Sequence, residues 1–131
     1  MANYYASARS NYFKVKNPDA FFEAMKPFDL DISDRNADDA LCLLCKNDGG
    51  WSWYNSDTEK DHNPVDIIAP HLQDNEVCIL METGAEKLRY LIGYAVAFNN
   101  KKRQTVLSLQ NIYDIARKEF GEQASITEAT Y

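Results

Sequence analysis

The sequence predicts an α+β domain with a mainly antiparallel sheet, two main helices and one short helix. Three observations predict it. Short apolar or alternating runs indicate strands, apolar residues recur at helical spacing in other segments, and glycine or asparagine turns separate neighbouring strands. A ferredoxin-like unit with an added hairpin, its helices on one face of the sheet, is the nearest simple topology.

The N-terminal third begins with a strand and a helix. Residues 4–15 alternate imperfectly, which predicts a strand with a bulge near Ser10. Asn17 and Pro18 then favour a helix start, because asparagine caps free N–H groups and proline suits the first helical position. Pro27 ends that helix, and residues 28–39 follow as an edge strand and an acidic loop.

The middle of the chain predicts a hairpin and a short helix. Residues 40–45 form a short, continuously apolar run, as a strand covered on both faces would. The turn at 47–50 and the alternation in 51–54 predict a returning strand. A polar loop over 55–63 leads to a short helix at 64–72, broken near Pro70.

The C-terminal third predicts three strands and a helix. A strand at 77–83 is followed by a turn at 83–85, by the clearest alternation of the chain at 88–98, and by a strand at 104–107. Within 88–98 the large side chains share the face expected in the core. The other face carries Gly93, Ala95 and Ala97, which allow a helix or a partner's backbone to approach closely.

Ser108 is expected to cap the last helix and Gly121 to end it. Apolar side chains recur in this helix at helical spacing: Leu109, Ile112, Tyr113, Ala116 and Phe120. Residues 1–121 are therefore expected to form a single α+β domain, and residues 122–131 a flexible C-terminal tail.

Charge is concentrated in the middle of the chain. Between Asp29 and Glu76, twelve carboxylates and three cations give a net charge of −9, against +2 before and +1 after this segment. Such a block either keeps the surface solvated or forms a functional acidic face. Direct nucleic-acid binding is disfavoured, because the only dense basic run is 101–103, which has the character of a hairpin tip.

The lack of a predicted membrane span or signal peptide and the number of cysteines bear on the cellular location. No apolar run reaches the length of a membrane span, and the N-terminus lacks the regions of a signal peptide. An odd number of cysteines, Cys42, Cys45 and Cys78, indicates reduced thiols. We therefore expect a cytoplasmic protein.

Enzymatic and metal sites are not expected. His62 and His71 stand near Asp61 and Asp66, and Ser52 or Ser56 is available as a nucleophile, yet no catalytic motif surrounds them. Nucleotide-binding glycine motifs are absent, so no cofactor is expected. The aspartates Asp29, Asp31, Asp34 and Asp38 lack the central glycine and closing glutamate of a calcium loop.

Aromatic residues beside the acidic block suggest a protein-binding site. Trp51 and Trp53 share a face and Tyr54 lies opposite, so at least one large ring is expected to be exposed; the alternative is that the tryptophans fill the core. The predicted partner-binding residues are Asp48, Trp51, Trp53, Tyr54, Asp57, Glu59, Asp61, Asp66, Asp74 and Glu76.

Two segments carry a resemblance. Residues 3–16, from Asn-Tyr-Tyr-Ala to Phe-Lys-Val-Lys, and residues 81–97, including Met-Glu-Thr-Gly-Ala-Glu-Lys-Leu-Arg-Tyr, resemble small phage and plasmid proteins. That group is similar to ferredoxin-like proteins carried beside antirestriction genes. The resemblance implies a mobile-element origin and supplies no catalytic residues, and the acidic middle departs from it.

These observations favour a non-enzymatic acidic binding protein in the bacterial cytoplasm. Carboxylates on a surface can imitate DNA phosphates, so the expected function is an anti-CRISPR or antirestriction inhibitor that occupies a basic surface of a host nuclease. One alternative is a single-stranded nucleic-acid-binding accessory protein that uses Tyr4, Tyr12, Tyr90, Arg9 and Arg89. Another is a small hydrolase that uses His62 or His71. The small-residue sheet face also favours a homodimer.

Overall fold

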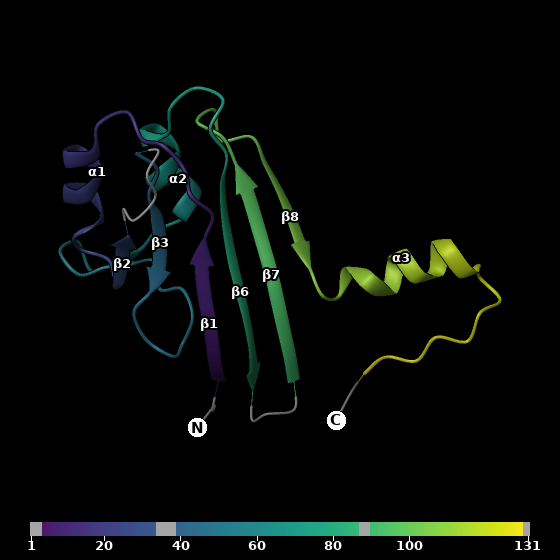
Figure 1. Cartoon of the computed structure of the whole chain (residues 1–131). Helices are drawn as coiled ribbons and strands as arrows, with labels where there is room; N and C mark the ends of the chain where they lie inside the picture. The colour runs from purple at the N-terminus through teal and green to yellow at the C-terminus, as the bar shows by residue number, and fades with distance from the viewer. Residues whose placement is uncertain (1–3, 34–38, 87–89, 130–131) are drawn as a thin grey trace.

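The computed structural model describes residues 4–33, 39–86 and 90–129. It contains a six-stranded sheet in the order β2-β3-β1-β6-β7-β8 and a separate β4-β5 hairpin (Figure 1). Neighbouring strands pair antiparallel throughout. The predicted α+β class with a mainly antiparallel sheet is confirmed. The elements are β1 (Tyr4–Ser10), α1 (Pro18–Met25), β2 (Leu30–Ser33), β3 (Cys42–Cys45), β4 (Tyr54–Asn55), β5 (Lys60–Asp61), α2 (Pro64–Ile68), the 3-10 turn η1 (Ala69–His71), β6 (Cys78–Glu86), β7 (Tyr90–Phe98), β8 (Gln104–Ser108) and α3 (Asn111–Phe120).

Local sequence determines the first two helices. The Asn17 side chain accepts a hydrogen bond from the Ala20 N–H at 3.1 Å, and Pro18 occupies the first turn of α1. Asn63 caps α2 in the same way, through the Val65 N–H at 3.0 Å. The helix predicted at 64–72 is broken where expected, since α2 gives way to η1 before Pro70.

The core lies between one face of the sheet and the helices α1 and α2. β1, β6 and β7 form the centre of the sheet, and alternate residues such as Leu80 and Phe98 point to the core, where they are almost completely buried. The largest buried side chains come from both layers: Phe13, Phe21, Leu43, Ile68, Leu72, Leu80 and Phe98. No helix in the described ranges has the length and apolar character of a membrane span.

The predicted hairpin between residues 40–45 and 51–54 is wrong. β3 is hydrogen-bonded to β1 on one side and to β2 on the other, so neither of its edges is free for a returning strand. Residues 51–53 lie outside any strand, and the backbone N–H of Trp51 donates instead to Glu82 Oε1 at 2.6 Å. Tyr54 begins β4, which pairs only with β5.

The turn predicted at 83–85 is also wrong, because β6 continues through it to Glu86. Gly84 is needed for close strand packing: a Cβ there would lie 2.5 Å from the Tyr5 carbonyl oxygen on β1. The residues that follow, 87–89, lie outside the described residues, and with them Leu88 and Arg89.

The third helix differs from the expectation in its cap and its position. Ser108 ends β8, and the cap residue of α3 is Gln110, whose side chain makes no capping bond; the Asn111 side chain accepts the Ser108 N–H at 2.6 Å. The helix ends at Gly121 as predicted, at a φ of 88°. It projects away from the sheet instead of covering the face that α1 and α2 cover (Figure 1).

Candidate functional site

The β4-β5 hairpin, residues 54–61, presents three of the predicted binding carboxylates, and we call it the acidic hairpin. The Asn55 side-chain oxygen accepts the N–H groups of Asp57 at 2.8 Å and Thr58 at 3.0 Å, while its carbonyl accepts the Glu59 N–H at 2.8 Å. Asparagine is suited to this role because its short side chain imitates a backbone turn. The tip of the acidic hairpin therefore has a fixed conformation.

The acidic hairpin is also fixed to the rest of the domain. The N–H and the hydroxyl of Ser56 both donate to the Pro27 carbonyl, at 3.1 and 3.0 Å, just after α1. At the other end, the His62 N–H donates to the Trp53 carbonyl at 2.9 Å. The Ser56 bonds hold the hairpin against the end of α1, and the bond between His62 and Trp53 closes its base.

The carboxylates of the acidic hairpin face solvent. Asp57, Glu59 and Asp61 are all exposed, and none of them forms an ion pair within the part of the chain that the structure describes. Glu59 adopts a left-handed backbone conformation with a φ of 56°. For a residue with a Cβ this conformation costs about 1–2 kcal/mol, so glycine or asparagine would be favoured here.

The neighbouring aromatic rings divide between the core and the surface. Trp51 and Trp53 stack with their ring centroids 5.4 Å apart, and Trp53 packs against Phe28 at 6.1 Å. Both tryptophans are half-buried against the core, and the Trp51 indole N–H is buried without a hydrogen-bond partner among the described residues. Tyr54 is 45% exposed and stands on the acidic hairpin itself.

Two further predicted carboxylates, Asp66 on α2 and Asp74 in the loop before β6, contact side chains of the β7-β8 turn. Lys102 Nζ lies 3.2 Å from an Asp66 oxygen, and the Asn100 side-chain N–H donates to Asp74 at 2.7 Å. These carboxylates are therefore less available to a partner than those of the acidic hairpin.

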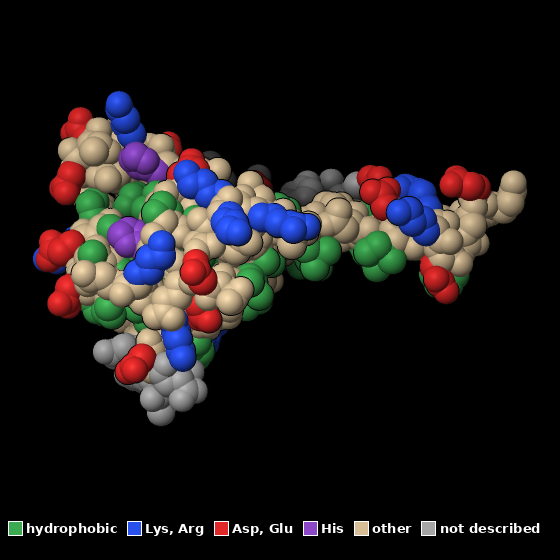
Figure 2. Space-filling model, turned by 90° about the horizontal axis from the view of Figure 1, so that it is seen from above, with side chains coloured by type: hydrophobic (Ala, Val, Ile, Leu, Met, Phe, Trp, Pro, Cys, Tyr) green, Lys and Arg blue, Asp and Glu red, His purple; other side chains and the backbone are tan. Residues whose placement is uncertain are grey.

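Glu76 and Asp48 occupy other places. Glu76 accepts the Lys14 backbone N–H at 2.7 Å and is partly buried. The Asp48 side chain is exposed, and the Asp48 backbone carbonyl accepts the N–H of Ala6 on β1 at 2.6 Å. The structure thus distributes the ten predicted residues, and several acidic side chains gather on the edge of the domain farthest from α3 (Figure 2).

The histidines do not form a catalytic group among the described residues. His62 is exposed, packs edge-on to Phe28 at 5.9 Å and lies 3.4 Å from the Thr58 hydroxyl. His71 packs edge-on to Phe21 at 5.4 Å, and burial, followed by the charge of Lys16, lowers its pKa. Neither ring is hydrogen-bonded to a carboxylate in the described ranges.

Metal ligands do not converge in the described ranges either. No group of three histidine, cysteine or carboxylate side chains is placed to hold an ion there. Two of the four aspartates weighed for calcium, Asp34 and Asp38, lie outside the described residues. The three cysteines are free thiols: Cys42 and Cys78 are buried, Cys45 is partly exposed, and burial raises the pKa of Cys78.

The residues weighed for single-stranded nucleic acid are only partly brought together. Arg9 lies over the ring of Tyr12, 5.7 Å from its centroid. Tyr4 instead donates its hydroxyl to the buried carboxylate of Glu82 at 2.7 Å, which turns it away from the face that carries Arg9. Arg89 and the side chain of Tyr90 lie outside the described residues.

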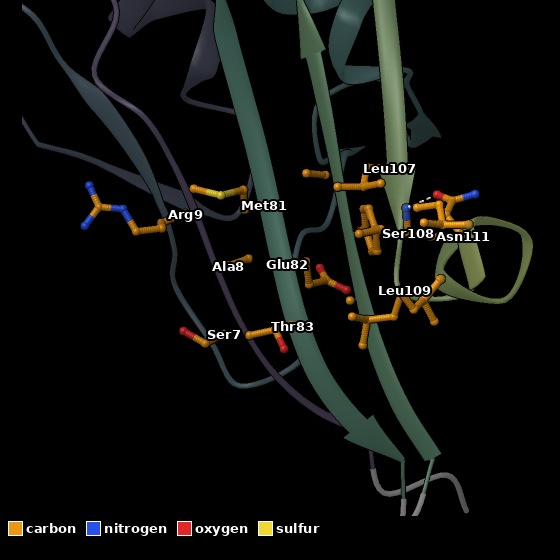
Figure 3. Close-up of a pocket in the computed structure, with 15 residues that line it drawn as sticks. Ser7, Ala8, Arg9, Met81, Glu82, Thr83, Leu107, Ser108, Leu109 and Asn111 are labelled. Carbon is orange, nitrogen blue, oxygen red and sulfur yellow. Dashed lines mark hydrogen bonds between the residues drawn. The ribbon is translucent and has the colours of Figure 1, made fainter. Parts of the chain in front are cut away.

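Sequence reasoning did not find an apolar groove of about 530 Å³ on the sheet face opposite α1 and α2 (Figure 3). Residues of β6, β7 and β8 and the start of α3 line it, among them Met81, Gly93, Ala95, Leu109 and Ile112. The small residues of β7 indicated that something approaches this face closely. The outward direction of α3, which leaves the groove open, depends on tertiary structure and has no local pattern.

Comparison of the chain with protein-family models, with curated proteins and with solved structures found no match.

Proposed function

We propose that this chain is a non-enzymatic binding protein of phage or mobile-element origin, which acts in the cytoplasm of a bacterial host. Its acidic hairpin occupies a basic surface of a nuclease complex of the CRISPR or restriction class and thereby excludes DNA. The binding residues at the centre of the contact are Asp57, Glu59 and Asp61, with Tyr54 as an aromatic contact.

The observation that supports this proposal is the fixed presentation of three carboxylates that have no cationic partner among the described residues. Binding to a partner costs little conformational entropy in the hairpin, because Asn55 and Ser56 already hold its backbone in place. Exposed charges of one sign also speed the encounter with a basic surface and do so most strongly at low salt. A purely solvating role would not require Glu59 to adopt a strained conformation.

The topology is consistent with the resemblance to ferredoxin-like proteins. β1, α1, β2, β3, α2 and β6 follow the β-α-β-β-α-β order of that unit, and their strands lie in the antiparallel order β2-β3-β1-β6. We propose a ferredoxin-like unit for this part of the chain, to which β7, β8, α3 and the acidic hairpin are additions.

The test is affinity capture from a nuclease-treated bacterial lysate that expresses a CRISPR or restriction effector, with elution by a salt step. The wild-type chain should retain a basic effector subunit until high salt, because the contact is electrostatic. A variant with Asp57, Glu59 and Asp61 changed to lysine should release it. The matched control changes the same number of exposed carboxylates elsewhere, Asp114, Glu122 and Glu128, to lysine and should retain the subunit. Equal retention by both variants would refute the assignment to the acidic hairpin.

A further inference from the structure

The helix α3 leaves its apolar side in water. None of its residues is buried, and Ile112, Ile115 and Phe120 are 56%, 53% and 72% exposed. In the view from above, hydrophobic side chains follow one edge of this helix and continue onto the domain body where the helix leaves it (Figure 2). An amphipathic helix of this kind needs an apolar surface to cover it.

A matching surface lies uncovered on the same chain. On the sheet face opposite α1 and α2, the small side chain of Ala95 leaves room for close approach, and Leu107 at the sheet edge is 60% exposed. The side chains that line the groove come from the sheet and from α3 itself (Figure 3), so an entering helix would contact both.

The chain does not cover this groove with its own helix. The Leu109 N–H donates to the Gly93 carbonyl at 2.8 Å. A Cβ at residue 93 would lie 2.9 Å from Leu109 Cγ, so the Leu109 side chain fills the space that the glycine leaves. This contact fixes the point at which the chain leaves the sheet. Beyond it α3 runs outward, away from the groove (Figure 1).

Charge and area favour a second copy as the occupant. Residues 77–131 carry seven cations and six carboxylates, so two copies can meet here without the repulsion of the −9 block. Burying one large aliphatic side chain removes on the order of 100 Å² of apolar surface from water. Six large apolar side chains on the groove side of the sheet, in the link after β8 or on α3 are at least half exposed: Leu91, Leu107, Leu109, Ile112, Ile115 and Phe120.

Together these side chains offer about 350 Å² of apolar surface per copy, by the same estimate. A stable interface takes about 800 Å² from each partner, of which about 450 Å² is apolar. The exposed side chains therefore supply most of the apolar area that one dimer interface requires.

We propose that the chain forms a symmetric homodimer in which α3 of each copy packs into the apolar groove of the other. The contact is the same on both copies, so it closes after two chains and forms no open filament. It places the two acidic hairpins at the outer ends of the dimer, remote from α3.

The test is the mass of the purified full chain in solution, measured by light scattering at about 100 µM, where a contact with a micromolar Kd is saturated. Wild type should have the mass of two chains. The double variant Ile112→Asp, Ile115→Asp should have the mass of one chain, with an unchanged circular dichroism spectrum because both positions are exposed in the single chain. The control Lys118→Asp changes the net charge by the same amount on the same helix and should remain dimeric.

Three outcomes would overturn the proposal. They are a wild-type chain that is monomeric at this concentration, a double variant that is still dimeric, and wild-type species larger than a dimer. Loss of the dimer in the Lys118→Asp control as well would also contradict it, because the effect would then come from charge and not from the apolar contact.

Discussion

Glu82, on the central strand β6, accepts the backbone N–H of Trp51 at 2.6 Å through one carboxylate oxygen and the hydroxyl of Tyr4 at 2.7 Å through the other. The residue is 8% exposed, and no cation pairs with its carboxylate among the described residues. Neutral donors therefore satisfy it. The bond from Trp51 holds the loop before the acidic hairpin against the sheet, and the bond from Tyr4 links β1 to β6.

Replacing Glu82 with alanine should lower the free energy of unfolding by about 2–3 kcal/mol, because two hydrogen bonds to a charged group are lost. Urea denaturation measures the change. Glu86→Ala on the same strand serves as the control, since Glu86 is partly exposed and makes no such pair of bonds among the described residues. Equal losses in the two variants would contradict the role given to Glu82.

Two glycines with similar backbone conformations should respond differently to alanine. Gly50 and Gly121 have φ values of 84° and 88°. At Gly121 the new Cβ meets nothing within 4 Å, so Gly121→Ala should cost only the backbone strain, about 1–2 kcal/mol. At Gly50 the Cβ would overlap a Glu82 carboxylate oxygen, so Gly50→Ala should cost clearly more. Thermal unfolding of both variants gives the comparison, and equal losses would show that the Glu82 contact yields freely.

Tyr94 should make stability depend on pH in the alkaline range. Burial, followed by the charge of Glu82, raises the pKa of Tyr94 from 10.0 to about 12. Since the folded state holds the phenol proton more tightly than the unfolded state, the stabilisation is complete below pH 10 and is lost as the pH rises towards about 12. Absorbance of ionised tyrosine reports the titration. Glu82→Gln should move the Tyr94 transition to lower pH, and an unchanged transition would contradict the influence of Glu82.

Glu59→Asn should stabilise the domain while it weakens partner binding. Asparagine tolerates the left-handed conformation better than glutamate, so the free energy of unfolding should rise by about 1 kcal/mol. Asp57→Asn removes the same charge from the same turn without relieving that strain, and urea denaturation should show no comparable gain. A destabilised Glu59→Asn variant would show that the Glu59 side chain makes a contribution to folding that outweighs its backbone strain.

The sequence predicts those parts of the fold that depend on neighbouring residues. Asn17, Pro18 and Pro27 are enough to locate α1, and Pro70 locates the change from α2 to η1. Pairings between distant segments were not predictable in this way. Ser10 pairs with Leu80, seventy positions later, and occupation of both edges of β3 excludes the hairpin that the turn at 47–50 would otherwise favour.

The candidate site was predictable in its residues more than in its arrangement. Charge alone selected Asp57, Glu59 and Asp61, and the structure exposes all three. Charge could not separate them from Asp66, whose pairing with Lys102 depends on the β7-β8 turn. The apolar groove likewise requires α3 to leave the sheet at Leu109, a property of the assembled fold.

The measurement that tests the proposed function most directly is competition between duplex DNA and this protein for a purified effector captured in the affinity experiment. If the acidic hairpin occupies the DNA-binding surface, rising DNA concentration should raise the apparent Kd of the protein in proportion, and a complex of all three components should not form. A stable ternary complex with an unchanged Kd would show that the protein binds elsewhere and does not exclude DNA by occupying its site.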